Sequence, residues 1–140
     1  EFMTLEETKN YNYSKEIVTN TIRLRLLDNG IIHYTYLPNV EVDDIQHQIN
    51  HEALLKLVDS DKKHPALLDG DDFANVTPEG RRLVRELEPL IPVSARAMVI
   101  KQLGHRIAGN FYIKFHKPII PTRIFNSHEE AIIWLKQFLN

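Results

Sequence analysis

The sequence predicts one α/β domain with a mixed five-stranded sheet and four helices, in the order ββαβαβαβα. Asp28-Asn29-Gly30 is a strong hairpin turn between two strand-like segments, because Asn and Gly accept a positive φ. After this hairpin, apolar strand patterns alternate with helical ones, which is typical of strand–helix units. Residues 62–82 contain a short buried strand, an acidic loop and a helix start, and the rest of the chain is organised around this crossover.

Length and composition are those of a single soluble globular unit. A chain of 140 residues buries about two-thirds of its unfolded surface and is too short for two ordinary domains. Apolar residues make up 43% and charged residues 26%, and no apolar run approaches the roughly 20 residues of a membrane helix. We therefore expect one soluble domain without a membrane span.

Charge and cysteine content exclude several classes of site. The chain has no cysteine, which excludes disulfides, a thiolate nucleophile and cysteine-ligated metal clusters. The formal net charge of −2 gives no general attraction to phosphate backbones, so no nucleic acid is expected as a partner. The cysteine-free composition is compatible with a reducing compartment, and we expect a cytoplasmic protein.

The N-terminal segment differs from the remainder. The two residues before Met3 resemble a cloning remnant, so the natural start is expected at Met3. Residues 3–16 are polar and without sustained periodicity, which predicts a mobile or loosely docked arm. We therefore divide the chain into an arm at residues 1–17 and a folded domain at residues 18–140.

The hairpin strands are expected at residues 18–27 and 31–36. In the first of them, apolar side chains alternate with Arg23 and Arg25, which is the period of a strand with one solvated face. A hairpin makes its two strands antiparallel, and right-handed crossovers keep the later strands parallel. The sheet should therefore be mixed.

The first helix is predicted at residues 43–58. Asp43 and Gln46 resemble a capping box that begins it. Apolar residues recur at intervals of three and four and are expected to face the sheet; they are Val42, Ile45, Ile49, Ala53 and Leu57. A central strand follows at residues 64–68, and its unbroken apolarity predicts cover on both faces.

The second and third helices flank another buried strand, at residues 95–100. Thr77 and Pro78 begin the second helix as N-cap and first helical residue, and Pro89 ends it. The third helix ends before Pro118. Its inward face is expected to comprise Leu103, Ile107 and Phe111.

The last strand–helix unit occupies the end of the chain. The strand, at residues 119–125, contains Pro121, which lacks a ladder donor, so we expect the strand at or near a sheet edge. Ser127 and Glu130 form a capping box for the final helix. The inner face of that helix is expected to comprise Ala131, Trp134, Leu135 and Phe138.

Several of these stretches carry a resemblance to a known family. The crossover, with its DGDD loop at residues 69–72 and TPEGRR at residues 77–82, resembles the STAS fold of anti-sigma-factor antagonists. Three later stretches are similar to a family of small uncharacterised STAS-like domains, related to the CRAL-TRIO fold and found mainly in Bacteroidetes; they are RIAGNFY (106–112), KPIIPTRIF (117–125) and SHEEAIIWL (127–135). The resemblance covers about residues 18–139.

The resemblance implies a regulatory module that binds a protein partner. In the antagonist branch, a serine or threonine at the start of the second helix is phosphorylated by a partner kinase, and this switches binding. The corresponding residue is Thr77, within NVTPEG at residues 75–80, which replaces the usual Asp-Ser-Ser-Gly signature. Thr77 is therefore interpreted as a helix cap and, by resemblance, as a candidate phosphorylation site.

The acidic loop and the start of the second helix are predicted to form the docking surface. A loop that follows a strand and precedes a helix lies at the carboxyl edge of an α/β sheet, where such folds bind partners and ligands. The candidate partner-binding residues are Asp69, Asp71, Asp72, Asn75, Thr77, Glu79 and Arg81. Self-association as a homodimer, through the edge strand or the third helix, is a further expectation.

Two arrangements resemble metal sites but are not assigned as such. The loop aspartates together with Lys117 resemble the magnesium pocket and lysine of phospho-receiver domains, but Lys117 precedes its strand and should lie at the opposite edge. His47 and His51 lie four residues apart, but no glutamate follows His47, and a solvated helix face is expected. We predict neither a metal nor a cofactor.

The alternative function is binding of a small anionic ligand, such as a lipid or a nucleotide. Arg81 and Arg85 of the second helix, with Arg106 of the third, are the candidate cations. The chain has no G-x-S-x-G elbow, Walker lysine or Rossmann glycine triplet. No catalytic residue is nominated, and a non-enzymatic role is expected.

Overall fold

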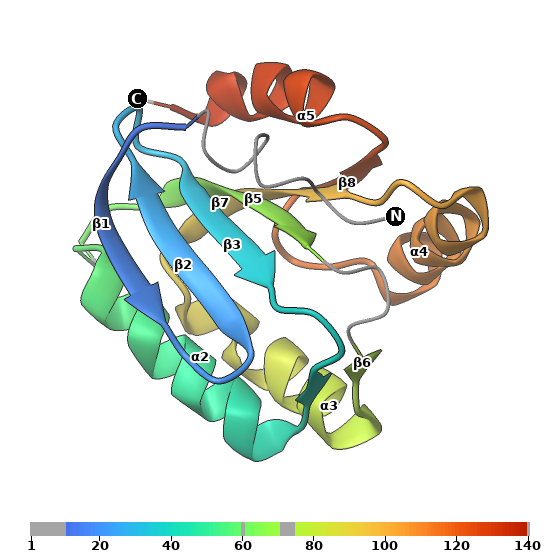
Figure 1. The fold of residues 1–140 in the computed structure, drawn as a ribbon. Coiled ribbons are helices and arrows are strands. Elements are labelled where there is room, and N and C mark those ends of the chain that lie inside the picture. The colour runs from blue at the N-terminus through green and yellow to red at the C-terminus, as the bar shows by residue number, and fades with distance from the viewer. Residues whose placement is uncertain (1–10, 60, 71–74, 140) are drawn as a thin grey trace.

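The computed structural model describes residues 11–59, 61–70 and 75–139 and shows a six-stranded sheet with helices on both faces (Figure 1). The strand order is β1-β2-β3-β5-β7-β8. These strands are β1 (Tyr13–Val18), β2 (Ile22–Leu27), β3 (Ile32–Tyr36), β5 (His64–Gly70), β7 (Val93–Val99) and β8 (Thr122–Phe125). A separate ladder pairs β4 (Glu41–Val42) with β6 (Asn75–Val76).

Four α-helices within the described residues surround the sheet. α2 (Asp44–Leu57) and α3 (Pro78–Leu87) cover one face, α5 (His128–Leu135) covers the other, and α4 (Leu103–His116) lies beside β8 (Figure 1). Short 3₁₀ turns follow α3 and α5, at Glu88–Leu90 and Lys136–Phe138. The α/β class and the number of helices agree with the sequence prediction.

The predicted mixed sheet is confirmed. β1, β2 and β3 form an antiparallel meander, whereas β3, β5, β7 and β8 run parallel. Gly30 adopts a φ of 94° in the turn between β2 and β3, the left-handed region that favours glycine. The central strand β5 contributes Ala66 to one hydrophobic cluster and Leu67 to the other. β8 lies at a sheet edge, as Pro121 predicts.

The sheet has six strands rather than the predicted five, because β1 lies in the segment predicted to be a loose arm. β1 pairs with β2, and most of its side chains are exposed. Across this pair Arg25 Nε donates to Glu16 Oε2 at 2.5 Å. Such an edge strand carries no apolar alternation, so periodicity could not reveal it. The sheet therefore begins at Tyr13, ahead of the predicted boundary at residue 18.

The three predicted helix caps are confirmed. Asp43 Oδ1 accepts from the backbone N–H of Gln46 at 2.8 Å, at the start of α2. Thr77 caps α3 and Ser127 caps α5 through equivalent bonds to the residue three positions on, at 3.1 and 3.3 Å. Each bond satisfies a helix N–H group that has no intrahelical acceptor.

α2 turns a different face to the sheet than its apolar spacing predicts. Ala53 and Leu57 are buried, but Ile45 and Ile49 are 64% and 40% exposed. Steps of four residues advance about 40° each around a helix of 3.6 residues per turn, so this row winds away from the sheet toward the helix start. His51 instead is buried against the sheet side.

α4 presents its apolar side chains to solvent, contrary to the prediction of an inward face. None of its residues is buried, and Leu103, Ile107 and Phe111 are 63%, 63% and 64% exposed. The side that bears Gly109 faces β8, where a Cβ atom at this position would lie 2.5 Å from Ile124 Cδ1. Small size at the contact, rather than apolarity, sets this orientation. Neither α4 nor any other described helix is long and apolar enough to cross a membrane.

Candidate functional site

Asp69, predicted to face a partner, lies instead at the centre of a buried polar cluster. It is 6% exposed and stands near the end of β5. Its Oδ2 accepts hydrogen bonds from Nε2 of His33 at 2.6 Å and of His128 at 2.8 Å, and its Oδ1 accepts one from Thr35 Oγ1 at 2.7 Å. We call these four residues the Asp69 cluster. A partner cannot reach this carboxylate without displacing the histidines, so Asp69 is not part of the exposed docking surface.

The hydrogen bonds of the Asp69 cluster compensate for burial of its charge. Burial alone raises the pKa of Asp69, but the bonds from His128, His33 and Thr35 outweigh burial and lower this pKa to about 2. An ionised carboxylate can only accept, so both imidazole Nε2 atoms are donors. The cluster joins β3, β5 and the first residue of α5, and thereby fixes the two central strands of the sheet to the last helix.

The other acidic residues of the predicted docking surface are only partly described. Asp71 and Asp72 lie outside the described residues. Asn75 in β6 and Glu79 in the first turn of α3 are exposed. These two side chains are therefore accessible, and their contact with a partner stays a prediction.

Thr77 and Arg81 are both engaged at the start of α3. Thr77 Oγ1 accepts the N-cap bond from Gly80 N at 3.1 Å. The exposed Arg81 donates from Nη1 to the carbonyl oxygen of Val76 at 2.6 Å. These bonds stabilise the helix start, and phosphorylation of Thr77 stays a prediction that mass spectrometry of protein from its native host would test.

The β4–β6 ladder holds the starts of α2 and α3 side by side. The two strands pair in parallel, and the backbone N–H of Thr77 donates to Val42 O at 3.0 Å. The helices approach closely there, since a Cβ atom on Gly80 would lie 2.5 Å from the same Val42 oxygen. Asp44 and Glu79, in the first turns of the two helices, consequently lie at one end of the pair. Acidic residues are favoured at these positive helix ends.

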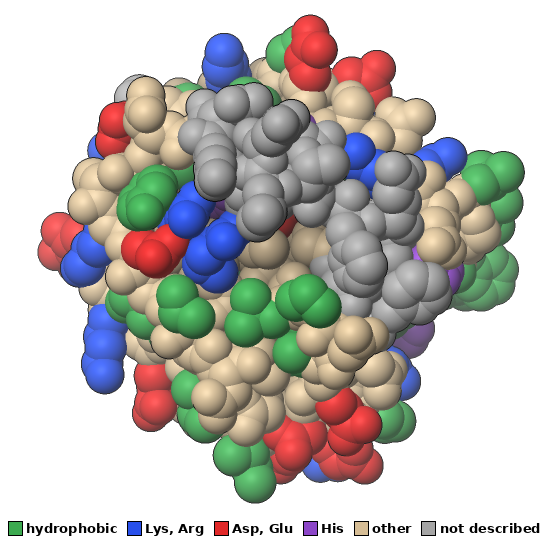
Figure 2. All heavy atoms as spheres, viewed as in Figure 1, with side chains coloured by type: hydrophobic (Ala, Val, Ile, Leu, Met, Phe, Trp, Pro, Cys, Tyr) green, Lys and Arg blue, Asp and Glu red, His purple; other side chains and the backbone are tan. Residues whose placement is uncertain are grey.

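An open groove of about 510 Å³ lies between α2 and α3. Ile45 and Ile49 supply exposed apolar surface from α2, and the half-buried Leu83 lines the groove from α3. Figure 2 shows acidic side chains gathered along the lower edge of the molecule, over the starts of these helices. We call this feature the acidic groove; its lining residues are Asp44, Ile45, Gln48, Ile49, Glu79, Arg82, Leu83 and Glu86.

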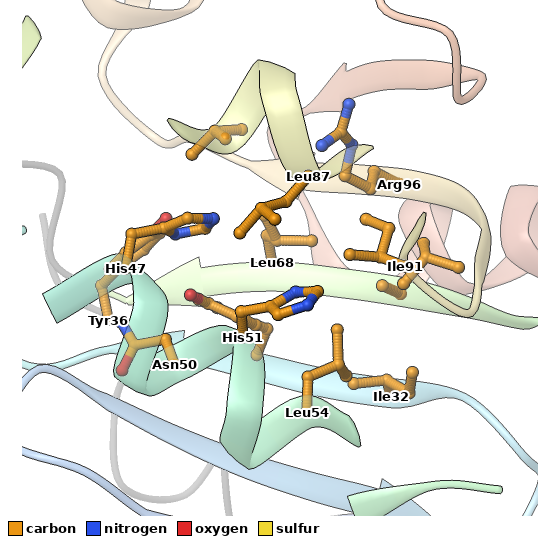
Figure 3. Close-up of a pocket in the computed structure, with 14 residues that line it drawn as sticks. Ile32, Tyr36, His47, Asn50, His51, Leu54, Leu68, Leu87, Ile91 and Arg96 are labelled. Atoms are coloured by element: carbon orange, nitrogen blue, oxygen red, sulfur yellow. The ribbon is translucent and has the colours of Figure 1, made fainter. Parts of the chain in front are cut away.

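A second hollow, of about 100 Å³, lies between the sheet and the inner sides of α2 and α3 (Figure 3). Most of its wall is apolar, including Leu54, Leu68 and Leu87. The polar side chains that line it are Tyr34, Tyr36, His47, Asn50, His51 and Arg96. An engineered cavity of about 150 Å³ binds benzene, so only a molecule of a few non-hydrogen atoms fits here.

His47 and His51 face this cavity rather than the solvent, contrary to the prediction. Burial and, to a smaller extent, the neighbouring His51 together lower the pKa of His47 to about 4. Burial also lowers the pKa of His51, whose Nδ1 is buried without a partner among the described residues. Both rings are therefore neutral at pH 7. Within the described residues, no group of three or more His, Asp or Glu side chains is arranged to hold a metal ion.

Two of the three cations predicted to bind an anionic ligand make hydrogen bonds to local backbone. Arg106 Nη1 donates to the carbonyl oxygens of Ile100 at 3.1 Å and Lys101 at 2.5 Å, beside the start of α4. Arg81 is held at the start of α3, and Arg85 is exposed on that helix. Two of the three guanidinium groups thus stabilise local backbone.

Sequence reasoning missed the acidic groove and the Asp69 cluster for different reasons. The groove could have been inferred from the sequence. Ile45 and Ile49 belong to a row of residues spaced by four, which winds around α2, and Ile45 directly follows the acidic Asp44. The cluster carried no such signal, because its members lie on separate strands and a distant helix start. His33 and His128 are 36 and 59 residues away from Asp69.

Comparison with known proteins gives a family. The model of a family described as a domain of unknown function (DUF7793) matches residues 25–139. No curated protein and no solved structure matches the chain. The family match begins within β2 and includes β3, all the strand–helix units and the acidic groove. Since it covers most of the 140 residues, this chain belongs to the DUF7793 family.

Proposed function

We propose that this domain is a non-catalytic docking module and that its acidic groove receives an amphipathic, basic helix of a protein partner. The observation that carries this proposal is the exposure of Ile45 and Ile49, 64% and 40%, in a groove that the carboxylates of Asp44, Glu79 and Glu86 also line. Apolar surface of this kind, rimmed by polar residues, marks interaction sites. The docking site thus moves from the loop at residues 69–72 to the adjacent groove, with Glu79 common to both.

The chemistry of the groove selects its occupant. A helix laid between two helices places residues at intervals of three, four and seven against the apolar floor, and fully burying one isoleucine contributes about 1.5–3 kcal/mol. The groove lining contains three carboxylates, those of Asp44, Glu79 and Glu86, and one cation, Arg82. This excess attracts Lys and Arg side chains and disfavours acidic partners, which sets specificity and the rate of encounter.

A STAS-like regulatory role agrees with this proposal. The sequence resemblance implies an interaction module controlled at the start of the second helix, and that helix supplies half of the acidic groove. Asn75, Thr77 and Arg81 lie beside the groove end at Glu79 and extend the proposed surface.

Affinity capture from the host lysate tests the proposal with a matched pair of variants. Ile45→Asp places a charge on the apolar floor, whereas Ile133→Asp makes the same change at an equally exposed isoleucine of α5, 61% against 64%. Wild type and Ile133→Asp should retain the same stoichiometric protein, and Ile45→Asp should lose it. Equal retention by all three proteins would remove the groove from the proposal.

Small-molecule binding in the inner cavity is a second candidate function. The unpartnered Nδ1 of His51 favours it, because a buried acceptor or donor is stabilised by a ligand that completes its hydrogen bond. Compounds of a few heavy atoms, smaller than benzene, should raise the melting temperature of the wild type. Val84→Phe fills the cavity wall and should abolish the shift, while Val18→Phe, at an exposed site of β1, should retain it. Equal shifts in both variants would contradict binding there.

A further inference from the structure

We propose that the partner of the acidic groove is a second copy of this chain, which inserts the apolar ridge of its α4. The α4 ridge is defined as Leu103, Ile107, Phe111 and Phe115. This inference rests on the proposed docking function and names its occupant. It follows from the exposure of the ridge, its charge and the matching chemistry of the groove.

The α4 ridge is built but uncovered. Its four side chains are 63%, 63%, 64% and 64% exposed, and the rings of Phe111 and Phe115 lie with centroids 4.4 Å apart. They recur every four residues over about 18 Å of helix. Gly109 packs against Ile124, and Arg106 is bonded to two backbone carbonyls, so the opposite side of α4 is held on the domain. The ridge is therefore presented outward by a fixed helix.

The stretch of chain that carries the ridge has charged side chains of one sign only. Residues 89–128 contain six Lys and Arg residues and no Asp or Glu, so the remaining residues carry 11 of the 17 basic and all 19 acidic side chains. Exposed Lys114 and Lys117 belong to this basic segment, at the end of α4 near Phe115. In Figure 2 the hydrophobic side chains at the right of the view, where Figure 1 places α4, lie beside basic and histidine side chains.

The acidic groove supplies the complement within the same chain. Its floor of Ile45, Ile49 and Leu83 matches an apolar helix face, and its carboxylates match the cations beside that face. A symmetric contact between two α4 ridges would instead bring the two basic segments together, and like charges disfavour it. Charge complementarity therefore favours ridge into groove over ridge against ridge.

Ridge into groove is a head-to-tail contact, with different surfaces on the two copies. Figure 1 places α4 beside the edge strand β8, apart from the starts of α2 and α3, so the ridge and the groove are separate surfaces and each bound copy leaves one of each open. Such contacts grow into a ring or an open chain. The protein should therefore form oligomers whose mass rises with concentration.

Complementation between two variants in sedimentation equilibrium tests this arrangement. Phe111→Asp removes the ridge and leaves the groove, and Ile45→Asp does the opposite; both sites are 64% exposed, so the fold should be spared, which circular dichroism checks. Each variant alone should sediment as a 16.3 kDa monomer, with self-association weakened about tenfold or more. An equimolar mixture should give a one-to-one dimer, because each copy retains the half that the other lacks. Ile133→Asp should assemble like the wild type.

Other results identify other occupants and overturn the inference. If Phe111→Asp is monomeric while Ile45→Asp assembles normally, the ridge binds another ridge. If the wild type is monomeric but co-sediments with phosphatidylserine vesicles, and Phe111→Asp does not, the ridge binds lipid. A wild type that stays monomeric and ignores vesicles also overturns it. In each case capture of a lysate protein that Ile45→Asp loses and Phe111→Asp retains would leave the docking function intact.

Discussion

Two histidine sites lie on opposite faces of the same sheet and differ in how their polarity is balanced. On the α5 face, His33 and His128 both donate to the buried carboxylate of Asp69. On the α2 face, His47 and His51 line an apolar cavity, and burial lowers the pKa of both. The first site stabilises the ionised carboxylate of Asp69, whereas the second disfavours the protonated form of its histidines. The comparison shows that residue type alone does not tell a structural histidine from one available to a ligand.

Among these variants, removing the carboxylate from the Asp69 cluster should reduce the free energy of unfolding most. Asp69→Ala leaves two imidazoles and the Thr35 hydroxyl buried without their acceptor, and we expect a loss of about 3 kcal/mol in the free energy of unfolding. Urea denaturation of this variant and of Asp28→Ala, at an exposed turn position, gives the measurement and its control. A loss no larger than that of Asp28→Ala would show that the cluster contributes little.

Acidification from pH 6.5 to 4 should lower the stability of the fold mainly because the α2 histidines become protonated on unfolding. The pKa of His47 falls from an ordinary value of 6.5 to about 4 on folding, so between these pH values the unfolded chain binds a proton that the folded chain excludes. Stability should therefore fall by about 2 kcal/mol from pH 6.5 to 4, allowing for the partial exposure of His47. The stability that ionised Asp69 contributes persists over this range. It is lost only as the pH falls from 3.8, the ordinary pKa of the carboxyl, toward its folded pKa of about 2.

Urea melts across this pH range separate the two sites. His47→Phe should flatten the decline between pH 6.5 and 4, whereas His116→Gln, at an exposed position of α4, should leave it unchanged. A decline that persists undiminished in His47→Phe would assign the acid sensitivity elsewhere.

The smallest effect on stability should come from replacing His51 of α2, and the neighbouring Asn50 provides the comparison. His51→Leu removes an Nδ1 without a partner among the described residues, so stability should stay within about 1 kcal/mol of the wild type. Asn50→Leu removes a side chain that accepts from Thr19 Oγ1 at 2.7 Å and donates to Thr21 Oγ1 at 2.8 Å, and should cost about 1–3 kcal/mol. Thermal denaturation compares them, and equal losses would indicate that His51 has a partner in solution.

Local signals in the sequence predicted local structure well. Asp43, Thr77 and Ser127 each cap the helix that their spacing indicates, because a cap depends on residues only three positions apart. Gly30 likewise forms the expected turn. The parallel arrangement of the later strands follows from connection rules that hold for most folds.

Features that depend on distant contacts were not predictable from the sequence. β1 acquires its identity only by pairing with β2, and Asp69 acquires its partners from β3 and α5. Periodicity identified α4 as amphipathic, but packing of Gly109 on Ile124 decided which side faces the domain. The acidic groove likewise required knowing that α2 and α3 start side by side.

The position of the chain end has a practical consequence for labelling. Leu139 lies against the β2–β3 turn, where its Cδ2 would be 3.5 Å from a Cβ on Gly30, and Figure 1 shows this corner far from both α4 and the start of α3. A fluorophore or surface tether attached after residue 140 would leave these two regions unobstructed. Immobilisation through that end is therefore the orientation of choice for biosensor and single-molecule work on this domain.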